Sequence, residues 1–359
     1  MYKRQRLCHA SSVAALLQSV GSAAVTAPFT AAKDAECIIV IGARPEQNHP
    51  VAASYLKQAV KNGSKLIIID PRKQNLSRYA THHLQFNPGQ DLSLLNAMIY
   101  TIIEEGLINK DYIKNNTEGF ELLEKEIKGF NPLLMEKLCG IKAEVIKEVA
   151  RLYAKSKTSI IFWGMGISQH VHGTQNAFCL INLALITGQV GRDGTGLHPL
   201  RGQNNVQGAS DAGLIPMSYP DYQRVSINKN QSEMESFWNV TLDPNEGKTV
   251  VEIIEDIASN KIKGLYVQGE NPAMSDPDQI HARKALAKLE HLVVQDIFMT
   301  ETAWHADVIL PASAHAEKNG TYTNTNRQVQ LGRAAVETPG NVKQDWWIIQ
   351  EIALSLIHI

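Results

Sequence analysis

Short apolar runs alternate with segments of helical periodicity along the chain. Residues 36–42 (ECIIVIG) and 65–72 (KLIIIDPR) are apolar runs that end in polar, turn-forming residues. The segment 50–60 between them has the apolar spacing of a helix. Because strands of a parallel sheet are buried on both faces, they read as continuous apolar runs, and this succession predicts a βαβ unit.

The alternation continues beyond this unit. Further strands are predicted at 158–166, 263–272, 291–298 and 306–312. Further helices are predicted at about 91–105, 117–127, 143–155, 172–188 and 278–288. Residues 214–248 are polar and are interrupted by prolines, so we expect irregular structure there.

The fold class predicted from this order is α/β, with mainly parallel sheets that carry helices on both faces. At 359 residues the chain is too long for one small core, so we expect two dinucleotide-binding-like lobes. Residues 6–200 would form the first lobe, 201–335 part of the second, and 336–353 a helical tail.

Composition excludes several classes of function. With 35 basic and 36 acidic residues, the chain lacks the positive charge of a nucleic-acid-binding protein. No apolar run is long enough to span a bilayer, and the N-terminus lacks the pattern of a signal peptide. The cysteines show no CxxC spacing, which argues against a zinc site or a complete iron–sulfur site and fits a reducing, cytoplasmic setting.

The two ends of the chain differ from the rest. MYKRQ and LSLIHI can be encoded by complementary strands of one oligonucleotide, which resembles a transposon adapter of sequencing libraries. We therefore expect residues 1–5 and 354–359 to be adapter read-through, and the remainder to be an internal fragment of a longer protein that is inactive alone.

Four predicted strands end in polar turns that carry glycine or proline: GARPEQNHP, DPRKQN, GMGISQ and GENPAMSD. In doubly wound sheets, ligands bind beyond the carboxyl ends of the strands, where glycine lets the backbone approach and helix N-termini offer N–H groups to phosphate. Each turn alone is as compatible with a structural role. Their recurrence in both lobes indicates one large ligand with nucleotide-like ends.

Two stretches carry candidate chemistry. RLCHASSVA places the thiol of Cys8 beside the imidazole of His9. A thiolate can bind a soft metal, and an imidazole with its ordinary pKa near neutrality can take up a proton. Taken alone, however, a buried thiol and a surface histidine are the more common explanation of such a pair. HPLRGQNNVQGASDAG, residues 198–213, is almost free of apolar side chains, so it is either a solvated loop or one that clasps a polar ligand.

A series of blocks in register resolves these alternatives. RLCHASSVAALLQSVGSAAVT, GMGISQH, RGQNNVQGASDAG, YVQGENPAMSD, QDIFMTETAWHADVILPA and EKNGTYTNTNRQVQ follow one another along nearly the whole chain. Together they resemble the molybdopterin oxidoreductase family and, more narrowly, the catalytic alpha subunit of metal-dependent formate dehydrogenases. The resemblance implies oxidation of formate to CO₂, with release of two electrons and a proton, at a molybdenum or tungsten ion held by two molybdopterin guanine dinucleotides.

The resemblance also implies roles for individual residues. Cys8 would be the protein ligand to the metal, and His9 and Arg201 would be catalytic. A guanidinium fork suits the two oxygens of formate. Cofactor-binding roles are implied for Gly42, Arg44, Asn48, Asp70, Arg72, Gly164, Met165, Gly166, Gln169, Gly202, Gln203, Asn204, Gly269, Glu270, Asn271, Ser275 and Asp296.

Two other readings remain at this stage. Nitrate reductases of the same family usually have methionine in place of His9 and a threonine-type residue in place of Arg201. A metal-free structural relative, like the large iron–sulfur subunit of respiratory complex I, would not need the Cys-His pair or RGQNN. His170 and His172 resemble a metal pair, but two residues apart they do not share a helix face, and we interpret them as structural.

Some parts of such an enzyme are missing from the chain. The family's N-terminal cysteine cluster, which holds a [4Fe–4S] centre, is absent, so we expect that cluster only in the parent protein. The expected partners are electron-transfer subunits: iron–sulfur proteins, NAD- or ferredoxin-linked subunits, or a hydrogenase.

Overall fold

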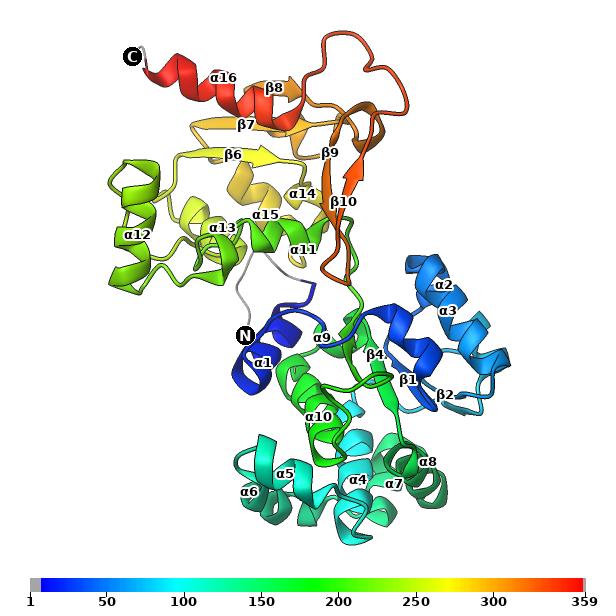
Figure 1. The fold of residues 1–359 in the computed structure, drawn as a ribbon. Helices are drawn as coiled ribbons and strands as arrows, with labels where there is room; N and C mark the ends of the chain where they lie inside the picture. Colours follow the sequence, from blue (N-terminus) through cyan, green and yellow to red (C-terminus); the bar gives the residue numbers. More distant parts are fainter. Residues whose placement is uncertain (1–7, 358–359) are drawn as a thin grey trace. The chain divides into compact units, whose positions relative to one another are not determined.

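The structure, a computed structural model, describes residues 8–357 and forms two compact units (Figure 1). Of the described residues, unit 1 contains 8–207 and 323–328, and unit 2 contains 208–322 and 329–357. The division falls after Gln207 and not after residue 200, so the RGQNN loop belongs to unit 1. The predicted read-through at 1–5 lies outside the described residues, and 354–357 end a helix.

Unit 1 is built on a five-stranded parallel sheet with the order β3-β2-β1-β4-β5. Its strands are β1 (Cys37–Ile41), β2 (Lys65–Ile69), β3 (His82–Leu84), β4 (Ser159–Trp163) and β5 (Gly196–Pro199). The strands predicted at 36–42, 65–72 and 158–166 are confirmed. Strands β3 and β5 were not predicted, because HHL and GLHP are short and contain few apolar residues.

Helices cover both faces of this sheet. They are α1 (Ala10–Val20), α2 (Pro45–Asn48), α3 (Pro50–Lys61), α4 (Asp91–Glu104), α5 (Lys110–Asn116), α6 (Phe120–Glu126), α7 (Pro132–Cys139), α8 (Ala143–Lys155), α9 (Met165–Ser168) and α10 (Gly173–Ile186). The chain enters unit 2 within α11 (Val206–Asp211). Successive β1 residues alternate between two apolar cores: Ile39 packs in the core that includes α4, α8 and α10, and Ile38 in the core that includes α3. The doubly covered sheet is therefore confirmed in unit 1.

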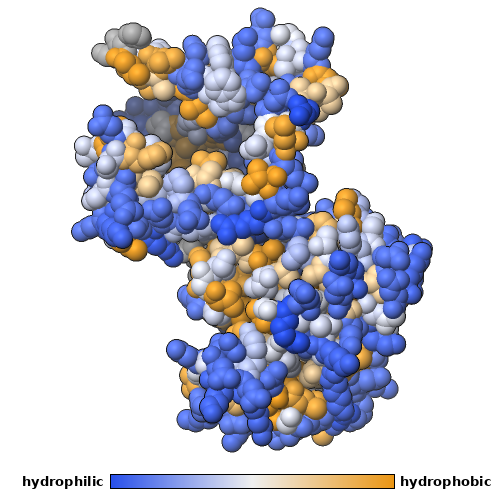
Figure 2. Space-filling view, viewed as in Figure 1, coloured by the Kyte–Doolittle hydropathy of each residue, from blue (hydrophilic) through white to orange (hydrophobic). Residues whose placement is uncertain are grey.

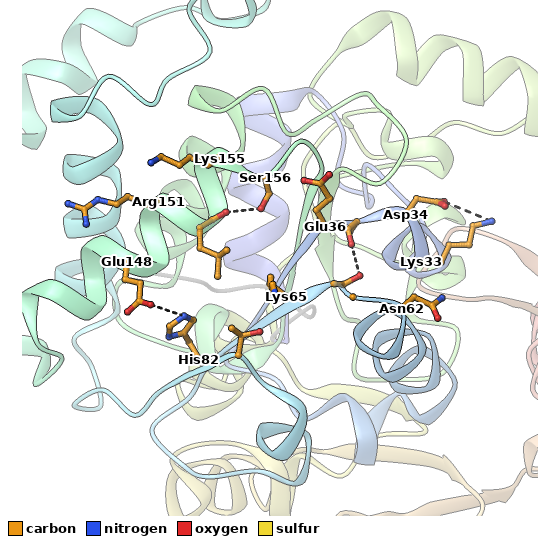
Figure 3. A pocket seen from close by; sticks show the side chains of 15 residues that line it. Lys33, Asp34, Glu36, Asn62, Lys65, His82, Glu148, Arg151, Lys155 and Ser156 are labelled. Atoms are coloured by element: carbon orange, nitrogen blue, oxygen red, sulfur yellow. Dashed lines mark hydrogen bonds and ion pairs between the residues drawn. The ribbon is translucent and has the colours of Figure 1, made fainter.

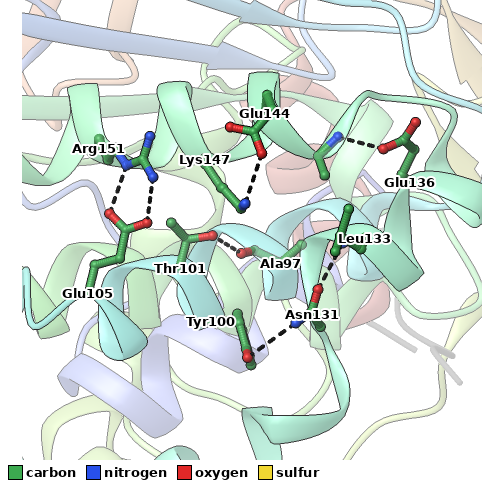
Figure 4. A network of polar contacts seen from close by, with 11 residues as sticks. Ala97, Tyr100, Thr101, Glu105, Asn131, Leu133, Glu136, Glu144, Lys147 and Arg151 are labelled. Carbon is green, nitrogen blue, oxygen red and sulfur yellow. Dashed lines mark hydrogen bonds and ion pairs between the residues drawn. The ribbon is translucent and has the colours of Figure 1, made fainter.

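Polar contacts join α4 to the helices packed against it (Figure 4). Arg151 on α8 donates two hydrogen bonds of 2.7 Å to the carboxylate of Glu105 at the end of α4. Asn131, the N-cap of α7, donates to the hydroxyl of Tyr100 on α4. Surface ion pairs of this kind contribute roughly 1 kcal/mol or less to stability. The apolar face of α8, which buries Ile146, Val149 and Tyr153, provides most of the attachment.

Unit 2 contains a three-stranded parallel sheet with the order β6-β7-β8. Its strands are β6 (Gly264–Gln268), β7 (His291–Asp296) and β8 (Val308–Pro311), and β9 (Gly320–Thr323) pairs with β10 (Val329–Gly332). Its helices are α12 (Asn228–Trp238), α13 (Val250–Ala258), α14 (Pro272–Ser275), α15 (Gln279–Leu286) and α16 (Asp345–Ile357). The expectation of irregular structure throughout 214–248 was wrong, because α12 forms there. The predicted tail at 336–353 becomes helical only at Asp345.

Unit 2 exposes many large apolar side chains. In α16 only Ile348 is buried, while Trp346 is 59% exposed and Ile357 is 76% exposed. In the space-filling view, hydrophobic residues are exposed toward the C-terminal end of this helix (Figure 2). Phe298 and Trp304, which follow β7, are 75% and 74% exposed. Surfaces of this kind are typical of faces that meet other protein.

Candidate cofactor and substrate site

Glycine backbones meet at the carboxyl ends of β1 and β4. The amide N–H of Gly166 donates to the carbonyl of Gly42 over 3.0 Å. A Cβ at Gly42, where φ is +56°, would lie 2.9 Å from backbone atoms of Gly166, and a Cβ at Gly164 would lie 2.6 Å from the Gly42 carbonyl oxygen. A side chain at any of these positions would push the two turns apart. Space therefore requires glycine at all three positions, and at Gly42 the backbone conformation requires it as well.

A cavity of about 310 Å³ opens beside these turns, within unit 1. Its lining includes nine of the residues predicted to bind the cofactor: Gly42, Arg44, Asn48, Asp70, Arg72, Gly164, Met165, Gly166 and Gly202. These residues come from the loops after β1, β2, β4 and β5. The topology therefore gathers residues that are up to 160 positions apart in the sequence.

The cavity also has walls that the sequence did not indicate. The turn after β3 contributes Phe86, Pro88 and Gly89, and Asp91 opens α4. The dipeptide Pro88-Gly89, followed by a helix that begins with an acidic residue, does mark a turn in the sequence. Because strand β3 was not predicted, the sequence did not indicate that this turn follows a strand of the sheet. His49 also lines the cavity, and nothing in its sequence surroundings marked it.

The cavity contains charges of both signs. The carboxylate of Asp70 accepts the backbone N–H of Arg72 over 2.8 Å, and burial raises the pKa of Asp70. Burial also raises the pKa of Asp91, while the nearby His170 opposes that shift. Arg44 and Arg72 supply positive charge at the same edge of the sheet. Such a mixture suits a ligand with phosphates at one point and hydrogen-bond donors at another.

His9 is buried as the N-cap residue of α1, with both ring nitrogens engaged. Its Nε2 donates to the carbonyl of Leu200 over 2.7 Å, and its Nδ1 lies 2.9 Å from the hydroxyl of Ser168. Burial, and secondarily the charge of Arg201, lowers the pKa of His9 to about 3. Burial of this kind disfavours the charged form of the ring, whereas the sequence predicted a ring whose pKa lies near neutrality. The catalytic role of His9 stays a prediction.

Arg201 directly follows Leu200 and is also buried. Its Nη2 donates to the carbonyl of Ala23 over 2.7 Å, and its own carbonyl accepts the Nε2–H of His49 over 2.5 Å. Thr325 places its hydroxyl oxygen 3.5 Å from the Arg201 amide nitrogen. The backbone and the guanidinium of Arg201 are thus both held by groups of unit 1.

Cys8 differs from the other cysteines. Cys37, Cys139 and Cys179 are buried in the core of unit 1, and burial raises the pKa of the Cys37 and Cys179 thiols to about 12. Cys8 is only partly buried and directly precedes His9. Because the thiolate is the form that binds metals, the three core thiols are unsuited to ligation and Cys8 is the candidate.

The remaining predicted residues lie elsewhere. Gln169, Gln203 and Asn204 are exposed and are not part of the lining of this cavity. His170 lines the cavity and His172 is exposed, so the two do not form a pair. In unit 2, five predicted residues gather beyond the carboxyl ends of β6 and β7: Gly269, Glu270, Asn271, Ser275 and Asp296. Asn271 and Asp296 already accept backbone N–H groups of nearby turns.

A wider depression lies at the opposite edge of the same sheet (Figure 3). It is lined by residues that precede or open β1, β2, β3 and β4, among them Glu36, Lys65 and His82. Its charged groups face one another, as in the ion pair between His82 and Glu148 at 3.6 Å. None of the predicted cofactor-binding residues lines it. Ligands of such sheets bind at the other edge, so we assign this depression no role.

A sequence profile of the molybdopterin oxidoreductase family matches residues 2–354. The chain belongs to this family. It is 46% identical to the F420-dependent formate dehydrogenase subunit alpha of Methanocaldococcus jannaschii, across 98% of this chain and 52% of that protein. It is 40% identical to formate dehydrogenase H of Escherichia coli, across 97% of this chain and 49% of that protein. The chain therefore spans about half the length of these relatives.

The fold agrees with this assignment. Acetylene hydratase from Pelobacter acetylenicus superposes with a TM-score of 0.74 at 24% identity, across 96% of this chain and 49% of that structure. At this level of identity the likeness concerns the fold alone. No helix among residues 8–357 is long and apolar enough to cross a membrane.

Molybdopterin oxidoreductases use a molybdenum or tungsten pterin cofactor, and the cavity of unit 1 fits such a group. The Gly42, Gly164 and Gly166 backbones leave open the space that Cβ atoms would fill, and Arg44 and Arg72 can pair with phosphate. Within residues 8–357, no three His, Cys, Asp or Glu side chains come together as a metal site. A metal held mainly by cofactor sulfurs needs only one protein ligand.

Proposed function

We propose that the full-length protein oxidises formate to CO₂, releasing two electrons and a proton, with Cys8 as the protein ligand to a molybdenum or tungsten ion. One observation carries this proposal: the His9 imidazole is hydrogen-bonded to Leu200, the residue before Arg201. This bond ties the Cys8-His9 pair to the arginine within unit 1. The identity of 46% to a formate dehydrogenase alpha subunit supports the same reaction.

The proposed cofactor is a pair of molybdopterin guanine dinucleotides. The cavity of unit 1 would hold one, with Arg44 and Arg72 on its phosphates and Asp70 accepting hydrogen bonds from the donor edge of guanine. The loops after β6 and β7 would hold the other through Gly269, Glu270, Asn271, Ser275 and Asp296. When bound, the metal centre supplies the chemistry that accepts the two electrons of formate.

Arg201 would bind the substrate. Its guanidinium is buried, and the hydrogen bond from Nη2 to the Ala23 carbonyl fixes the direction of the side chain. Attraction between a guanidinium and a carboxylate is stronger where water is excluded. Arg201 would therefore hold the two formate oxygens and leave the C–H bond directed away from the guanidinium.

His9 would shape the substrate site as a neutral imidazole. Its Nε2–H is committed to the Leu200 carbonyl, and its Nδ1 accepts from a serine hydroxyl. The ring therefore fixes the position of the Leu200–Arg201 backbone.

The proposal includes partners and a location. Electrons would pass through a [4Fe–4S] cluster held by parts of the protein outside this chain, and on to iron–sulfur, NAD- or ferredoxin-linked, or hydrogenase subunits in the cytoplasm. The designation of the relatives as subunit alpha supports the presence of other subunits.

The test is to measure two activities of the full-length protein with the same dye couple. Formate-dependent reduction of an oxidised viologen is expected, and nitrate-dependent oxidation of reduced viologen is not. Nitrate reduction without formate oxidation would transfer the assignment to the nitrate-reductase type. Absence of both metal and pterin would identify the protein as a structural relative.

A further inference from the structure

The polar groups around His9 form one continuous series inside unit 1. The indole Nε1 of Trp163 lies 2.8 Å from the hydroxyl of Ser12, which lies 2.7 Å from the hydroxyl of Ser168. The Ser168 hydroxyl lies 2.9 Å from Nδ1 of His9, and His9 Nε2 lies 2.7 Å from the Leu200 carbonyl. The series thus passes from β4 through α1 and α9 to the end of β5.

Both ends of the series fix its direction. An indole nitrogen can only donate and a carbonyl oxygen can only accept. Nε2 of His9 must therefore carry the hydrogen that bonds to Leu200, which leaves Nδ1 of the neutral ring as an acceptor. The order that uses the shorter of the two contacts to Nδ1 is that Trp163 donates to Ser12, Ser12 to Ser168, and Ser168 to Nδ1 of His9. Each hydroxyl then uses its single hydrogen once.

Burial makes this order hard to replace. Trp163 and Ser12 are 0% exposed, Ser168 is 4% exposed and His9 is 3% exposed. Because water does not reach these groups, a broken link leaves an unsatisfied polar atom in a low-dielectric interior. The ring also has an alternative contact of 3.2 Å to Ser12, which is longer than the bond to Ser168. Loss of the Ser168 hydroxyl would draw the ring toward Ser12 and away from its present orientation.

We propose that Ser12, Ser168 and Trp163 are positioning residues that set the orientation and the hydrogen-bonding roles of the His9 ring. Because Nε2 of the ring is hydrogen-bonded to the Leu200 carbonyl, these residues also fix the position of the peptide group that joins Leu200 to Arg201. The effect on formate oxidation rests on the proposed function, whereas the orientation of the ring does not.

A purely structural role would be different. The same hydroxyls would then only attach α1 to α9, and any buried hydrogen bond between these helices would matter equally. Ser11 provides the control on the same helix. It is 4% exposed, and its hydroxyl donates to the backbone carbonyl of Ser168 over 2.9 Å without contacting the hydroxyls, the indole or the ring of the series.

The experiment compares Ser168→Ala, Ser12→Ala and Trp163→Phe with Ser11→Ala in the full-length enzyme, loaded with its cofactor and labelled with ¹⁵N-histidine. The His9 signals are identified by their loss in His9→Gln. The wild type is expected to show one protonated and one unprotonated ring nitrogen. The three series variants are expected to shift the Nδ1 signal, and Ser11→Ala is expected to leave it in place.

Kinetics give the second measurement. A displaced ring would lower kcat for formate on the order of ten-fold in the series variants, with a smaller change in KM. Ser168→Thr, which restores a hydroxyl, is expected to recover most of the Nδ1 shift. Trp163→Phe and Ser12→Ala keep the test decisive if Ser168→Ala does not fold.

The outcomes separate the two proposals. Unchanged Nδ1 signals in all three series variants would overturn the positioning role, and so would an equal shift in Ser11→Ala. A full-length protein that does not oxidise formate would refute the proposed function, while the ¹⁵N signals would still decide how the ring is held.

Discussion

The Nε2 atom of His9 donates a hydrogen bond to the carbonyl oxygen of Leu200, 2.7 Å away and 191 residues further along the chain. This bond joins the beginning of α1 to the end of β5, and both partners are buried. It brings the neighbourhood of Cys8 to the backbone that carries Arg201.

Gly42→Ala is expected to destabilise unit 1 and reduce cofactor content. The new Cβ would meet Gly166 at 2.9 Å, and alanine at a φ of +56° is strained. Together these effects would lower the free energy of unfolding by roughly 2 to 4 kcal/mol. Urea denaturation and metal analysis check this. Gly21→Ala, with a φ of +72° and no atom within 4 Å, is the control that carries only the backbone strain. Equal losses in both variants would show that the close contact is unimportant.

Arg201→Lys is expected to impair formate use while leaving the metal content unchanged. Lysine has a single charged point and cannot present the planar fork that matches a carboxylate. The ratio kcat/KM for formate should fall on the order of a hundred-fold, equivalent to about 2.7 kcal/mol. The control is Arg151→Lys, which loses two surface hydrogen bonds to Glu105 and should retain activity. Normal kinetics of Arg201→Lys would show that Arg201 does not bind formate.

His198 is expected to make unit 1 sensitive to acid. Burial lowers the pKa of His198 from 6.5 to about 3, so between these pH values the unfolded chain binds a proton that the folded chain does not. Folding stability therefore falls as the pH drops through this window, by on the order of 1.4 kcal/mol per pH unit for this group. Urea titrations at several pH values should show a shallower slope in His198→Gln. An identical slope in both proteins would show that the folded state protonates His198 normally.

Cys8 is expected to be the most reactive thiol of the folded chain. The three core cysteines are buried, and burial raises the pKa of their thiols, whereas Cys8 is partly exposed. Brief treatment of the cofactor-free protein with iodoacetamide, followed by peptide mass analysis, should find the label on Cys8. Unfolding in urea before treatment should label all four cysteines. Early label on Cys37 or Cys179 would mean that the core of unit 1 opens readily.

Local sequence was sufficient for much of the fold. Strands β1, β2 and β4 each contain at least four consecutive apolar residues, which is the local signature of a strand buried on both faces. Helix α8 was predicted because its apolar residues repeat with the period of a helix that packs on one face. The turns after these strands were recognisable from their glycines. The Cys8-His9 pair and RGQNN stood out because their residue types matched a known family.

Other features depended on distant partners and had no local signature. The short strands β3 and β5 exist because β2 and β4 offer free edges to pair with, not because HHL or GLHP favours a strand. Asp91 and His49 reached the cavity only when the sheet was assembled.

The sequence by itself determined the candidates for chemistry: a thiol, an imidazole and a guanidinium in surroundings that resemble those of a known family. Only the tertiary structure decided the state of the imidazole. Trp163, Ser12 and Ser168 belong to three different elements, and burial of the ring among distant parts of the chain is the main cause that lowers the pKa of His9 to about 3. Desolvation and hydrogen-bond direction depend on what surrounds a group in space, and the neighbours of His9 along the chain do not supply those surroundings.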